Sequence, residues 1–182
     1  ATVDRSKAEG QRNRAILETL YSCGLRVSEL VNLKLSDLYF DEGFIKVEGK
    51  GNKQRLIPIS PRAINEIKLY FTDRNQIEVK SGHEDFVFIS LRRGKRLSRI
   101  MIFHMIKELA QQASITKNIS PHTFRHSFAT HLLEGGANLR AIQCMLGHES
   151  IATTEIYTHI DRNVLRSEII EHHPRNIKYR KE

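Results

Sequence analysis

The sequence has only two cysteines, Cys23 and Cys144, and they do not form a CxxC pair. Both lie in apolar segments with helical spacing, which is typical of buried, reduced thiols. The pattern therefore favours a reduced, cytoplasmic protein over a disulfide framework or a zinc ribbon.

Long apolar runs are also absent from the sequence. No stretch reaches the roughly 18 consecutive apolar residues of a membrane-spanning helix, and no signal peptide opens the chain. The first residues, ATVDRSKAEGQRN, are polar and lack an initiator Met, so we expect a fragment whose N-terminal part is missing. The 182 residues, 40% of them apolar, suit one domain with a true core.

Acidic residues are in the minority, because 21 Asp and Glu stand against 29 Lys and Arg and leave a formal net charge of +8. This surplus says nothing about the fold, but it favours a polyanionic partner, with nucleic acid as the first candidate. A merely basic protein is the alternative.

The spacing of apolar residues predicts a mostly helical chain. The expected helices cover residues 11–23, 26–34, 61–79, 98–113, 121–134, 138–146, 150–158 and 161–172. The segments 44–49 and 54–60 alternate apolar with polar residues around KGNK, which predicts a β-hairpin, and 85–90 suggests a short strand. The expected fold class is α+β, mainly α-helical, with a small antiparallel β-sheet.

The segment SPHTFRHSFATHLLEGG, residues 120–136, concentrates histidine and arginine on an expected helix. Ser120 is a candidate N-cap with Pro121 after it, and His122 and Arg125 follow in the first turns. Free N–H groups and the helix dipole favour an anion there, which indicates a phosphate site. A metal held by His122 and His126 is the alternative, but it lacks a third ligand and the glutamate of an HExxH helix.

Two basic segments offer further candidates. In GLRVSEL, Arg26 precedes a new helix and Glu29 can pair with it, although a surface ion pair of little worth explains the same residues. In GKGNKQR, Lys50, Lys53 and Arg55 surround a glycine-containing turn that can enter a DNA groove, or that is simply solvated.

Two later residues carry little weight by themselves. His148 follows a glycine in LGHES, and Tyr157 in TTEIYTH is, taken alone, typical of a half-buried surface aromatic.

Together these motifs resemble the tyrosine recombinases of the phage integrase family. The matching positions, in the family's order, are Arg26, Lys50, His122, Arg125, His148 and Tyr157. The resemblance covers nearly the whole chain and is strongest to the Xer type, which resolves chromosome dimers, through HSFATHLLEGGANLRAIQCMLGH and EHHPR. It implies a tyrosine recombinase catalytic domain over residues 1–182 without the N-terminal core-binding domain, with a C-terminal helix and basic tail at 161–182.

The resemblance also implies a mechanism, in which Tyr157 attacks the scissile phosphorus and forms a 3′-phosphotyrosine. Arg26 and Arg125 would clamp the non-bridging oxygens, and His122 would assist removal of the phenolic proton.

The remaining site residues have supporting roles by the same resemblance. Lys50 would protonate the leaving 5′-oxygen, although Lys53 in the same turn can exchange roles with it. His148 would hydrogen-bond the phosphate and Glu29 would orient Arg26, while Lys53 and Arg55 are expected to bind DNA.

The resemblance implies neither a metal nor another cofactor. Its implied partners are a double-stranded DNA recombination site, further protomers in a tetramer on that DNA, and an FtsK-like DNA translocase. The C-terminal helix would dock into a neighbouring protomer, with packing on its own domain as the alternative. A mobile-element integrase, a type IB topoisomerase and a non-catalytic DNA-binding module are the competing functions.

Overall fold

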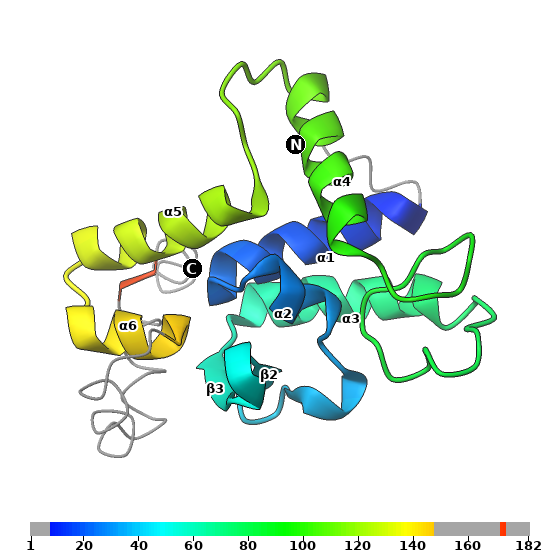
Figure 1. The fold of residues 1–182 in the computed structure, drawn as a ribbon, viewed down its shortest axis with the longest axis horizontal. Helices are drawn as coiled ribbons and strands as arrows, with labels where there is room; N and C mark the ends of the chain where they lie inside the picture. The colour runs from blue at the N-terminus through cyan, green and yellow to red at the C-terminus, as the bar shows by residue number, and fades with distance from the viewer. Residues whose placement is uncertain (1–7, 148–171, 174–182) are drawn as a thin grey trace.

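The computed structural model describes residues 8–147 and 172–173. Two helices open the described chain, α1 (Ala8–Cys23) and the short α2 (Val27–Val31). A three-stranded sheet follows, and then come α3 (Pro61–Arg74), α4 (Arg99–Gln112), α5 (Pro121–Glu134) and α6 (Leu139–Leu146). Figure 1 shows α5 and α6 side by side at one end of α1, whereas α4 rises from the body of the molecule.

The sheet is antiparallel and has the order β1-β2-β3. Its strands are β1 (Leu38–Tyr39), β2 (Phe44–Glu48) and β3 (Gln54–Pro58), so the predicted hairpin is confirmed. The turn between β2 and β3 contains a short 3-10 helix (Lys50–Asn52), and the Gly49 N–H donates to the Lys53 carbonyl at 2.7 Å.

Serine caps start three of the helices near the residues that the sequence indicates. Ser60 and Ser98 accept hydrogen bonds from the N–H groups of Ala63 and Met101 through their hydroxyls, and Ser120 precedes Pro121 at the start of α5. The predicted start and end of α5 are confirmed, while α3 ends five residues before the predicted position 79.

The buried apolar residues form two clusters. The larger lies between α1, α2, α3, α4 and the sheet, with Ile16, Leu20, Ile57 and Phe88 fully buried. The smaller lies between α5 and α6 and includes Phe128. The α5–α6 pair therefore has its own core and must be joined to the rest by further contacts.

The prediction of a strand at 85–90 is wrong. Phe86 and Ile89 form only isolated bridges, to Lys34 and Arg96. Side chains of α3 take the backbone groups that a ladder would use, because Arg74 donates to the carbonyls of residues 84, 86 and 87 and the Tyr70 hydroxyl donates to residue 87.

The predicted helix at 150–158 and all but the last residue of that at 161–172 lie outside the described residues. Within the described part, no helix combines the length and apolar character needed to span a membrane.

Candidate active site

Three arginines surround the carboxylate of Glu29. They come from segments far apart in the sequence: Arg26 immediately before α2, Arg55 on β3 and Arg125 on α5. The Glu29 side chain itself is buried on α2. Three positive charges against one negative leave an excess of two at this place, which favours binding of an anion.

Arg26 is the most accessible of the three arginines. It is the N-cap residue of α2, and its backbone N–H donates to Glu29 Oε1 at 2.9 Å, which satisfies a free donor of the helix start. Its guanidinium Nη1 lies 3.9 Å from Glu29 Oε2, and its side chain is 39% exposed. This separation is beyond hydrogen-bonding distance, so the guanidinium and the carboxylate interact through their charges alone.

Arg125 is buried, and two backbone carbonyls fix its guanidinium. Nη1 donates to the Gly24 carbonyl at 2.8 Å and Nη2 to the Leu146 carbonyl at 2.6 Å. Both carbonyls lie at helix C-termini, where the dipole is negative and the last carbonyls lack partners within the helix.

Burial first and the neighbouring charges of Arg26 and Arg55 second lower the pKa of Arg125 to about 10, against an opposing effect of Glu29. The side chain therefore keeps its charge at neutral pH with little water around it. A poorly hydrated guanidinium forms stronger hydrogen bonds to an anion than one in bulk water does.

Arg55 does not lie where a DNA contact was expected. It is only 7% exposed, and its guanidinium binds both carboxylate oxygens of Glu29, with Nη2 at 3.0 Å from Oε1 and Nη1 against Oε2. Its Nε donates to the Met145 carbonyl at 2.9 Å. In the described structure its donors are thus used inside the protein.

Glycines allow the backbone to approach these arginines. A Cβ on Gly49 would lie 3.3 Å from Arg55 Nη1, and one on Gly147 would lie 3.1 Å from the same guanidinium. Gly147 also has φ +68°, as expected for a residue that ends a helix in the left-handed conformation. The glycines of the GKGNKQR and LGHES segments therefore help to close the site.

The other predicted site residues that the structure describes lie at the surface. Lys50 and Lys53 are exposed at the hairpin turn, and His122 is exposed on the first turn of α5. His148 and Tyr157 lie outside the described residues. The structure therefore brings together Arg26, Glu29 and Arg125, and leaves the choice between Lys50 and Lys53 open.

Sequence reasoning missed the internal role of Arg55, although a signal was present. Residues 55, 57 and 59 share one face of a strand, and Ile57 and Ile59 are apolar, so Arg55 belongs to the inward face. A charge at such a position needs a partner inside the protein.

A metal ion bound by His122 and His126 would need a third ligand, and the described residues do not supply one. Both histidines are exposed, and within 8–147 and 172–173 no three side chains of His, Cys, Asp or Glu lie close enough together to hold an ion.

The chain is similar to many known proteins. Residues 1–163 match the phage integrase family. The chain is 48% identical over 175 residues to the tyrosine recombinase XerD of Staphylococcus saprophyticus, covering 96% of this chain and 59% of that protein. It is 49% identical over 164 residues to the XerD of Chlorobaculum tepidum, covering 90% and 54%.

Solved structures agree with these relatives. The crystal structure of XerA recombinase matches with a TM-score of 0.70 and 37% identity, over 90% of this chain and 59% of that one. XerH recombinase in a pre-cleavage complex with its difH substrate matches with a TM-score of 0.69 and 29% identity, over 87% and 45%. The chain thus spans about half the length of the relatives it matches.

The matched residues extend from the first position to beyond Tyr157 and include the arginines around Glu29. The chain therefore belongs to the phage integrase family and is similar over most of its length to the Xer-type tyrosine recombinases.

Proposed function

We propose that this chain is the catalytic domain of a site-specific DNA recombinase that cuts and rejoins strands through a 3′-phosphotyrosine on Tyr157. The observation that carries the proposal is the pair of guanidinium groups on Arg26 and Arg125, held apart from their shared carboxylate neighbour by 3.9 Å each. Two such forks suit the non-bridging oxygens of a phosphodiester, which gain negative charge in the transition state.

Covalent chemistry explains how strands are exchanged without ATP. Attack by the Tyr157 hydroxyl on phosphorus forms the Tyr–O–P bond and breaks the P–O5′ bond, so the bond energy is kept for religation. His122 takes the phenolic proton, and Lys50 gives a proton to the departing 5′-oxygen, with Lys53 as the alternative donor. His148 donates a hydrogen bond to the phosphate.

The biological role and the assembly are proposals of the same kind. Identities of 48–49% to XerD proteins favour chromosome dimer resolution over a mobile-element integrase, although a mycobacteriophage integrase also matches with a TM-score of 0.70 at 27% identity. We propose a tetramer on a double-stranded DNA site in the cytoplasm, with residues 161–182 as a helix and basic tail. An FtsK-like translocase as a partner rests on the resemblance alone.

The test is a covalent adduct on duplex DNA that carries the recombination site with a nick beside the scissile phosphate. In the presence of excess EDTA, the wild-type chain should form a covalent adduct with this DNA. Protease digestion of the adduct should leave a tyrosyl peptide on the 3′-phosphate. Tyr157→Phe should bind the same DNA with unchanged affinity and form no adduct, because only the hydroxyl is lost.

Tyr39→Phe, on an exposed edge of the sheet, is the matched control. An adduct with Tyr157→Phe would exclude Tyr157 as the nucleophile, and wild-type binding without any adduct would favour a non-catalytic DNA-binding module.

A further inference from the structure

The carboxylate of Glu29 is a competitor for the phosphate that the site is proposed to bind. It is an anion that lies 3.9 Å from both Arg26 and Arg125, and a small rotation would let it hydrogen-bond either guanidinium. A carboxylate and a phosphate use the same donor fork of arginine. Something must therefore keep Glu29 from taking the donors of the two arginines.

Arg55 has the geometry to do this. It binds both oxygens of Glu29, one with Nη1 and the other with Nη2 at 3.0 Å, so the carboxylate is held by a bidentate pair. Its Nε is fixed by the Met145 carbonyl at 2.9 Å, and Gly49 and Gly147 pack against the same guanidinium. The pair is buried, which makes its separation costly.

The contacts of Arg55 also explain why a glutamate is tolerated in an anion site. One Glu29 oxygen accepts from the Arg26 N–H and thereby starts α2, so the carboxylate is needed to place Arg26. Its negative charge is then neutralised by the bidentate pair with Arg55.

We propose that Arg55 is a positioning residue that sequesters Glu29 and so keeps Arg26 and Arg125 available for the scissile phosphate. The proposal rests on the proposed function in so far as it names that phosphate as the anion. It replaces the expectation that Arg55 contacts DNA. It also predicts that the effect of an Arg55 substitution on phosphate affinity depends on the carboxylate of Glu29, which a DNA contact by Arg55 would not produce.

The experiment is a double-mutant cycle with inorganic phosphate as the probe. Phosphate affinity is measured by calorimetry for the 182-residue chain, Arg55→Gln, Glu29→Gln and the double variant, each first shown to be folded by circular dichroism. Arg55→Gln should weaken binding roughly tenfold, the size usual for coupled neighbours, because Glu29 then occupies the two arginines. Glu29→Gln keeps a side-chain oxygen that can accept from the Arg26 N–H. It should not raise affinity in the wild-type background, where Arg55 already holds the carboxylate, but it should restore most of the lost affinity in the Arg55→Gln background.

The pattern of the cycle separates this proposal from others. If Glu29 acts only through long-range electrostatics, Glu29→Gln should raise phosphate affinity equally in both backgrounds, and this additive result would overturn the proposal. Unchanged phosphate binding by Arg55→Gln would overturn it as well. A merely structural role would alter the unfolding temperature without altering the affinity of the folded protein. The Asp37–Lys46 pair, 3.4 Å apart, is the matched control, because Lys46 pairs with Leu56 on β3 and so lies on the opposite face of the sheet from Arg55. Lys46→Gln should leave phosphate binding unchanged.

A second variant of Arg55 and the separate adduct assay cover the case in which Arg55→Gln does not fold or the proposed function fails. If Arg55→Gln does not fold, Arg55→Lys retains the buried charge but not the bidentate geometry. It should then weaken phosphate binding in a way that Glu29→Gln reverses, and wild-type affinity for Arg55→Lys would contradict the proposal. The adduct assay on the wild-type chain is independent of this cycle, so loss of the proposed function and loss of the Arg55 role are distinguishable.

Discussion

At the scale of single residues, Gly24 meets two requirements of the site at once. Its φ of +65° ends α1 in the left-handed conformation, and its carbonyl accepts a hydrogen bond from Arg125 at 2.8 Å. A Cβ at this position would overlap the ring of Phe128, which is fully buried on α5. The glycine therefore allows α5 to approach α1 closely enough for Arg125 to reach the helix end.

Gly24→Ala should lower the free energy of unfolding by about 2–4 kcal/mol, because backbone strain and overpacking add. Gly82→Ala is the matched control, since Gly82 has φ +86° but no atom within 4 Å of the place where a Cβ would lie, and it should cost only the strain of about 1–2 kcal/mol. Urea unfolding monitored by circular dichroism measures both. Equal losses for the two variants would mean that the contact with Phe128 relaxes freely.

Cys23 and Cys144 illustrate how far a residue-level prediction from sequence can reach. Both thiols are buried, as their apolar surroundings indicate, and burial raises the pKa of each. No pattern in the sequence, however, shows that Met145, next to Cys144, supplies a carbonyl to Arg55. Burial follows from composition, whereas a partner far away in the chain follows only from the tertiary fold.

At the scale of elements, the sequence predicts those whose pattern is local. The alternation of the hairpin and the apolar stripe Phe124, Phe128 and Leu132 of α5 specify a strand pair and a helix by themselves. The segment 85–90 has the apolar character of a strand, but the hydroxyl and guanidinium groups of Tyr70 and Arg74 satisfy its backbone. These hydrogen bonds from α3 replace the pairing with a neighbouring strand, and they cannot be predicted from the sequence of the segment itself.

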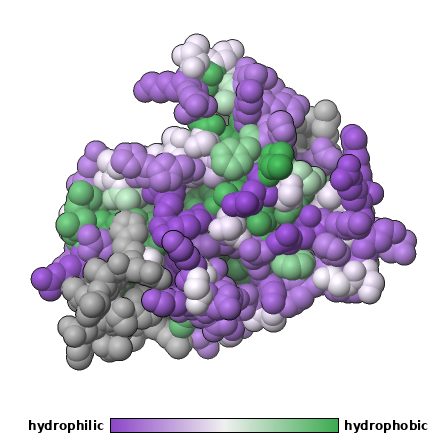
Figure 2. All heavy atoms as spheres, in the orientation of Figure 1, coloured by the Kyte–Doolittle hydropathy of each residue, from purple (hydrophilic) through white to green (hydrophobic). Residues whose placement is uncertain are grey.

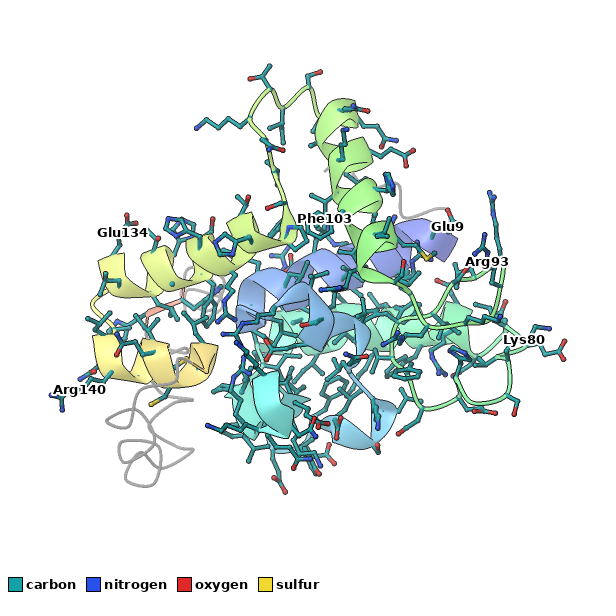
Figure 3. All side chains as sticks on the ribbon, in the orientation of Figure 1. Glu9, Lys80, Arg93, Phe103, Glu134 and Arg140 are labelled. Atoms are coloured by element: carbon teal, nitrogen blue, oxygen red, sulfur yellow. The ribbon has the colours of Figure 1, made fainter. Side chains whose placement is uncertain are left out.

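Helix α4 has two faces with opposite consequences for stability. Ile102 and Ile106 are buried, with 1% and 3% exposure. Ile100 is 68% exposed, and Phe103, which is labelled in Figure 3, is 47% exposed. Hydrophobic residues also lie on the visible face near this helix in Figure 2.

Ile102→Ala should therefore cost about 2–5 kcal/mol of unfolding free energy, because it leaves a cavity in the main core. Ile100→Ala, the matched control on the exposed face of the same helix, should stay within about 0.5 kcal/mol of the wild type. Thermal and urea unfolding give both values. A large loss for Ile100→Ala would show that its face is covered in solution.

At the scale of the whole molecule, the arginine cluster lies where two apolar cores meet. The α5–α6 pair extends away from the main body, so that Glu134 and Arg140 mark its outer end in Figure 3. Arg125 joins the end of α1 to the end of α6, and Arg55 joins β3 to the end of α6. Arg125, which is proposed to bind phosphate, and Arg55, which is proposed to hold Glu29, thus also connect the two halves.

Residues 172–173 add another connection, formed within one chain. His173 is fully buried, with its ring 4.8 Å from that of Tyr21 and 5.8 Å from that of Phe128, and its Nε2 lies 3.3 Å from the Tyr21 carbonyl. For these two residues the contacts favour packing on the own domain over docking into a neighbouring protomer.

His173→Ala should therefore destabilise the isolated chain, because it removes a buried ring and a hydrogen bond at the junction of α1 and α5. We expect a loss of about 1–3 kcal/mol and a decrease in Tm of ~2–10 °C in differential scanning calorimetry. His126→Ala, an exposed histidine on α5, is the matched control and should leave Tm unchanged. The decrease should be independent of protein concentration, since the contact is within one chain. If His173→Ala is as stable as His126→Ala, or if its effect appears only at concentrations where the chain self-associates, then the end of the chain packs on a neighbouring protomer and the intramolecular arrangement is wrong.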